Sequence, residues 1–126
     1  MVNLKRFERE FTPVLEQLRA ALEPAVGVLL WKDAREARLV THTERRDFVR
    51  VGPIFGDGVA LSTIDPDAVL EIFNKAASSA NLHPAQRTET VNGEYSWTAD
   101  DQIGTTLELR IGRDVRFWMD TEALAE

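Results

Sequence analysis

The sequence of 126 residues contains no cysteine and no long apolar run. Without cysteine, the chain has neither a disulfide framework nor thiolate chemistry. Its longest apolar run, AVGVLLW at 25–31, has the length of a strand and falls far short of the ~20 residues that span a membrane. The first residues lack the continuous apolar stretch of a signal peptide. We therefore expect a cytoplasmic protein that does not associate with a membrane.

Catalytic and cofactor-binding motifs are also missing. The sequence has no Gly-x-Ser-x-Gly, no His-Glu-x-x-His and no glycine-rich loop that opens a helix to hold phosphate. The acidic pattern DPD at 65–67 lacks the ligand spacing of a calcium loop. The two histidines, His42 and His83, stand apart from any partner that the spacing would enforce. These observations predict no catalytic residue, no metal and no cofactor.

The net charge of −6 is unevenly distributed. Residues 1–50 carry ten Lys/Arg and eight Asp/Glu, whereas residues 51–126 carry five and thirteen, which gives +2 and −8. The basic residues between 32 and 50 alternate with acidic ones, as in a solvated surface with salt bridges. Nucleic-acid binding through Arg35, Arg38, Arg45, Arg46 and Arg50 therefore conflicts with an acidic chain of pI about 5. We expect no nucleic-acid partner.

Length and composition predict one domain over residues 1–126. Apolar residues recur at helical spacing from Leu4 to Leu22, but Pro13 interrupts the pattern. This leaves two alternatives: a kinked helix over 4–22, or a turn followed by a helix over 13–22 that Thr12 caps. In both cases Pro24 is expected to end the helix. A second helix is predicted after Asp65, which would be its N-cap, with Asn81 in the left-handed position at its end.

The remaining segments alternate like antiparallel strands. Strands are expected at 25–31, 37–43, 47–55 and 59–62, with Gly52-Pro53 marking a bulge or an edge and the glycines at 56–58 marking a turn. Asn92-Gly93 predicts a hairpin that sets Thr90 opposite Tyr95. The pattern predicts an α+β fold with antiparallel sheet of about seven to eight strands and two principal helices, in the order α-ββββ-α-ββββ.

The last hairpin, LELRIGRDVRFWMD at 107–120, offers one candidate surface. A three-residue loop at 112–114 pairs Leu109 with Phe117 and places the apolar side chains on one face, whereas a one-residue slip would mix the faces. Arg110 then lies opposite Arg116, and Trp118 shares their polar face. Either one guanidinium stacks on the indole while Glu108 pairs with the other, or the two arginines await an anion or a partner's carboxylates.

Two functions follow from these patterns. The first is a non-catalytic protein-interaction or regulatory module (adaptor, secretion-chaperone-like or immunity-type) that binds a protein partner or a second copy as a homodimer. Its contact residues would be Arg110, Arg116 and Trp118, since tryptophan and arginine are enriched in interface hot spots. The alternative is a small-molecule-binding or enzymatic domain, with an aromatic pocket between helix and sheet. That ligand pocket would be lined by Trp31, His42, Tyr95 and Trp97.

Overall fold

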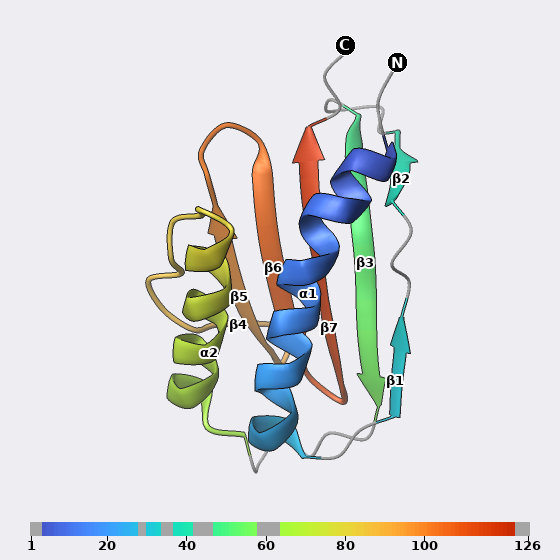
Figure 1. Ribbon diagram of the computed structural model, residues 1–126. Helices are drawn as coiled ribbons and strands as arrows, with labels where there is room; N and C mark the ends of the chain where they lie inside the picture. The colour runs from blue at the N-terminus through green and yellow to red at the C-terminus, as the bar shows by residue number, and fades with distance from the viewer. Residues whose placement is uncertain (1–3, 28–29, 34–36, 42–46, 58–63, 123–126) are drawn as a thin grey trace.

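The computed structural model describes residues 4–27, 30–33, 37–41, 47–57 and 64–122. Its element order is α-β-β-β-α-β-β-β-β, with seven antiparallel strands in one sheet, which confirms the predicted α+β class. The strand order is β1-β3-β7-β6-β5-β4, and β2 pairs with β3 beyond the end of β1. Both helices lie on the same face of the sheet (Figure 1). The strand predicted at 59–62 lies outside the described residues.

Helix α1 (Leu4–Val26) is continuous through both Pro13 and Pro24. Its ribbon bends in the N-terminal half (Figure 1), as expected for a helix that lacks one N–H donor and must accommodate the proline ring. The prediction that Pro24 ends the helix is wrong, because Ala25 and Val26 remain helical and Gly27 leaves the helix at φ +90°. The predicted strand at 25–31 is therefore shortened to β1 (Leu30–Asp33).

Strand β3 (Phe48–Asp57) organises one half of the sheet. It pairs with β1 and with β2 (Ala37–Val40) along one side and with β7 (Asp114–Glu122) along the other. The register shifts between Val51 and Ile54, so the bulge predicted at Gly52-Pro53 is present and keeps both of these side chains in the core. The turn predicted at 56–58 begins later than expected, because Gly56 and Asp57 continue the strand.

Helix α2 (Pro66–Ser79) begins and ends as the sequence predicts. The Asp65 carboxylate accepts hydrogen bonds from the backbone N–H groups of Asp67 and Ala68, at 3.1 and 3.4 Å, and Pro66 occupies the first turn. Asn81 adopts a left-handed conformation with φ +59°, and the N–H of Leu82 donates to Ala77. Neither helix of the described residues is both long and apolar enough to cross a membrane.

The second half of the sheet is a meander of four strands, β4 (Glu89–Val91), β5 (Glu94–Asp100), β6 (Thr105–Ile111) and β7. Asn92 and Gly93 both have positive φ, and Thr90 pairs with Tyr95, as the hairpin signal predicts. The β6–β7 pairing also has the predicted register, with Leu109 opposite Phe117.

The core lies between the two helices and the sheet. α1 packs over β2, β3 and β7, while α2 packs over β5 and against α1. Every second side chain of β6 and β7 is completely buried there. The largest fully buried side chains are Trp97, Phe73, Phe117, Leu15, Leu18, Leu22, Ile54, Leu107, Leu109, Ile111 and Met119.

The loop between β5 and β6 is held by the carboxylate of Asp101. This group accepts the backbone N–H groups of Ile103 and Thr105, both at 3.0 Å. Partial burial raises the pKa of Asp101, but these hydrogen bonds lower it by more, so its pKa lies below the ordinary value of an aspartate.

Because the folded state depresses the pKa of Asp101, this carboxylate stabilises the fold at a pH above its unfolded-state value of about 3.9. Its contribution is lost as the pH falls through the folded pKa. Asp101→Asn should therefore be less stable than wild type at pH 7, and the difference should shrink below about pH 4. Urea unfolding at a series of pH values measures this; a difference that is constant from pH 7 to pH 3 would contradict it.

Candidate functional site

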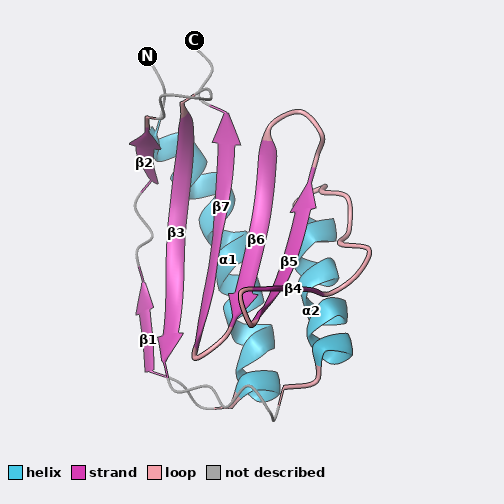
Figure 2. Ribbon diagram, turned by 180° about the vertical axis from the view of Figure 1, so that it is seen from behind, coloured by secondary structure: helices cyan, strands magenta, loops and turns pink. Residues whose placement is uncertain are grey.

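One face of the sheet has no helix over it (Figure 2). We call it the uncovered face; it is formed by the side chains that alternate with the core residues of each strand. On β7, for example, Phe117 and Met119 point into the core, so Arg116 and Trp118 point the other way. Antiparallel sheets commonly leave one face to solvent. What this face carries therefore decides what the protein can contact.

Trp118 lies near the middle of the uncovered face between two arginines. The guanidinium carbon of Arg50 is 5.1 Å from the indole ring centroid, and that of Arg110 is 6.0 Å from it. Arg50 comes from β3 and Arg110 from β6, the two strands that flank β7. Both contacts are within the range of cation–π attraction. The indole is half-buried and its position is fixed from both sides.

Gly52 allows this arrangement. It has φ +107°, a conformation that side chains other than glycine's rarely adopt, and a Cβ there would lie 3.1 Å from Cβ of Trp118 and 3.2 Å from the carbonyl oxygen of Phe117. The bulge therefore brings the bare backbone of β3 against the base of Trp118.

The arginines on both sides of Trp118 are paired with carboxylates. Arg50 binds Asp120 through two hydrogen bonds of 2.8 and 3.0 Å, and Arg110 donates to Glu108 at 3.0 Å. These groups are largely shielded from solvent, with side-chain exposures between 18% and 35%. Paired in this way, the guanidinium groups are neutralised and held in place.

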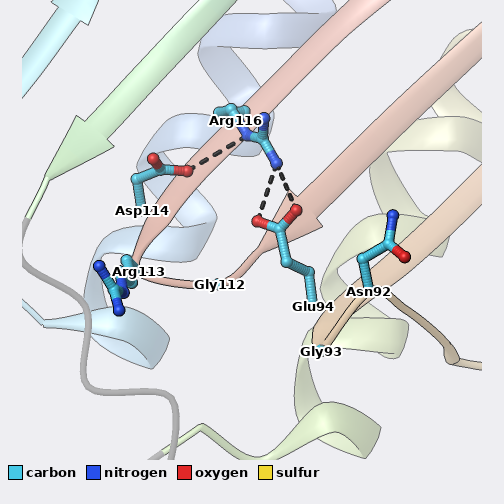
Figure 3. Close-up of a pocket in the computed structure, with 7 residues that line it drawn as sticks. All are labelled: Asn92, Gly93, Glu94, Gly112, Arg113, Asp114 and Arg116. Atoms are coloured by element: carbon cyan, nitrogen blue, oxygen red, sulfur yellow. Dashed lines mark hydrogen bonds and ion pairs between the residues drawn. The ribbon is translucent and has the colours of Figure 1, made fainter.

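Arg116 forms a second ion-pair group at the end of the hairpin (Figure 3). Its Nη2 lies 2.7 and 2.8 Å from the two carboxylate oxygens of Glu94, and its Nε lies 3.2 Å from Asp114. These residues line a surface hollow of about 510 Å³ between the β4–β5 and β6–β7 turns. Gly112 leaves room for Glu94, because a Cβ at Gly112 would meet the Glu94 side chain.

The sequence prediction for this surface is confirmed in register and incomplete in partners. Arg110 does lie opposite Arg116, and Glu108 lies opposite Trp118. A single guanidinium was expected to stack on the indole while Glu108 paired with the other. Instead Arg110 makes both contacts. The sequence analysis missed the contacts of Arg50, Asp120, Glu94 and Asp114, of which those to Arg50 depend on the long-range β3–β7 pairing.

The four residues of the alternative ligand pocket are not brought together around one cavity. Trp97 is 1% exposed in the core, and its indole N–H donates to the Thr88 hydroxyl at 2.8 Å. Trp31 on β1 packs edge-on against Phe117, with ring centroids 6.1 Å apart. Tyr95 lies on β5, so β3, β7 and β6 separate it from Trp31. His42 lies outside the described residues.

Comparison with models of protein families, with curated proteins and with solved structures gives no match. Within the part of the chain that the structure describes, no three His, Asp or Glu side chains are grouped so as to hold a metal ion. His83 is exposed, and its backbone N–H donates to Asp100 at 2.8 Å. The argument for function therefore rests on the uncovered face.

Replacing Gly52 by alanine should lower the free energy of unfolding by about 1–3 kcal/mol, because the new Cβ meets the backbone of β7 at an unfavourable φ. Gly93→Ala is a matched control, since Gly93 has φ +78° but no atom within 4 Å of its added Cβ. Chemical denaturation measures both. An equal loss in the two variants would show that the close approach to Trp118 does not matter.

Proposed function

We propose that the protein is a non-catalytic interaction module that binds another protein chain through its uncovered face. The observation that carries this proposal is Trp118, held between Arg50 and Arg110 on a sheet face with no helix over it. Tryptophan and arginine dominate the energetics of protein interfaces, because they offer large contact areas and directed hydrogen bonds.

The order of this cluster favours binding further. Association costs free energy for each side chain that it immobilises. Arg50 and Arg110 are already fixed by Asp120 and Glu108, and the indole is fixed by the arginines. A partner would therefore meet a surface that is arranged before contact.

The internal pairing also narrows the kind of partner. Arg110, Arg116 and Arg50 each have a carboxylate at hydrogen-bond distance, so a single free anion would have to compete with groups on the same face. A protein surface needs no such displacement, because it can cover the neutralised cluster and make additional contacts at its edge. We therefore favour a protein partner, which includes a second copy of this chain.

Replacing Arg110 and Trp118 together by alanine tests the proposal. The variant should remain folded, because cation–π contacts at such sites contribute about 0.5–2 kcal/mol. A photo-crosslinking residue at Thr98, which is exposed on the uncovered face, should link wild type to another chain in cells and lose most of that product in the double variant.

Ser78 provides the matched control, since it is exposed on α2, on the opposite side of the protein. A crosslinker there should give no product that depends on Arg110 and Trp118. The proposal fails if the Thr98 products are the same in wild type and double variant, with both proteins folded by circular dichroism.

A further inference from the structure

The outward side chains form a row that crosses the whole sheet and has opposite charges at its ends. Successive strand pairings connect the residues of this row. They are Lys32, Phe55, Arg116, Arg110, Ser96 and Glu89, in the order β1-β3-β7-β6-β5-β4. The central arginines are neutralised by Glu108, Glu94 and Asp114. The row therefore carries a cation at the β1 end and an anion at the β4 end.

The terminal charges have little to satisfy them within the chain. Lys32 is exposed and has no ion-pair partner among the described residues. Glu89 contacts only Arg87, at 3.5 Å, and both side chains are more than half exposed. A surface pair of this kind contributes little.

Other side chains follow the same division. Arg38 and Arg50 point outward on β2 and β3, whereas Glu94 and Asp100 point outward on β5. Asp57, at the end of β3, is the exception among the described outward residues on the basic side.

Two exposed apolar side chains mark the same ends of the sheet. Leu30 on β1 is 81% exposed and Val91 on β4 is 39% exposed. Leu30 is two residues from Lys32, and Val91 is two residues from Glu89, so each shares the outward face with its charged neighbour. Each end of the face thus offers one charge and one apolar contact, with the charges opposite in sign.

We propose that the occupant of the uncovered face is a second copy of this chain, related by a two-fold axis that runs parallel to the strands between β7 and β6. This axis turns the row end for end, so that Lys32 faces Glu89 of the second copy and Leu30 faces Val91. A two-fold axis along the row would instead place Lys32 beside its own counterpart. Charge complementarity therefore selects one of the two face-to-face arrangements.

The size of the face suits such a dimer. Six strands at ~4.8 Å spacing and about seven residues at ~3.4 Å give a face of roughly 24 Å by 24 Å. With the relief of the side chains included, this footprint approaches the ~800 Å² that each partner buries in a standard interface. Twisted sheets pack face to face with their strands about 30° apart, which is compatible with an axis parallel to the strands. Trp118 lies on β7, next to this axis.

This dimer rests on the proposed function, because it names the partner of the same face. The test measures mass against protein concentration by sedimentation equilibrium. Wild type should dimerise, and more weakly above about 0.5 M salt. Lys32→Glu and Glu89→Lys should each weaken the dimer about tenfold, since each places like charges at two symmetric positions. The variant with both substitutions should recover most of the affinity.

Lys75→Glu is the matched control, because Lys75 is exposed on α2 away from this face, and its dimer should equal that of wild type. Wild type that is monomeric up to about 1 mM would overturn the dimer, as would a dimer that the combined variant fails to restore. If the Thr98 crosslinks then hold a different protein and depend on Trp118, the interaction function stands without the dimer. If no crosslink depends on Trp118, the function itself fails.

Discussion

The alternation of side chains in the β6–β7 hairpin determines both faces of the protein. Because Leu109 faces Phe117 in the core, Arg110 must face Arg116 on the other side, and Trp118 must face Glu108. A slip of one residue would bury the arginines and expose the apolar side chains, which costs several kcal/mol for a single unpaired charge. Packing of the core thus fixes the positions of the charged and aromatic groups on the uncovered face.

The arrangement places two like charges opposite each other, which alone would destabilise the hairpin. Neighbouring strands compensate for it: Glu94 on β5 binds Arg116, and Glu108 on β6 binds Arg110, while Trp118 separates Arg110 from Arg50. The bulge at Gly52 belongs to the same solution, because it keeps Val51 and Ile54 in the core and lets β3 approach Trp118. The ion pairs and the indole therefore form one connected surface rather than separate contacts.

Local patterns in the sequence predict much of this fold. Asp65 and Pro66 start α2, Asn92-Gly93 turns the β4–β5 hairpin, and binary alternation sets the β6–β7 register, since each signal depends on neighbouring residues. Pro24 misled the helix prediction, because a helix can pass through a proline when packing of α1 outweighs the lost hydrogen bond. The role of Arg50 could not be predicted, since it depends on β3 pairing with β7, seventy residues away from Arg50 at Asp120. The pocket hypothesis failed to bring Trp31 and Tyr95 together for a similar reason, because three strands separate them.

The central claim is that the uncovered face is a protein contact surface centred on Trp118. Hydroxyl-radical footprinting, read by mass spectrometry, tests it most directly when dilute purified protein is compared with concentrated protein and with protein in cell extract. Oxidation of Trp118 should fall in at least one of the two crowded samples, while oxidation of Ile103, which is 82% exposed in the β5–β6 loop, stays constant. Equal oxidation of Trp118 in all three samples would contradict the account.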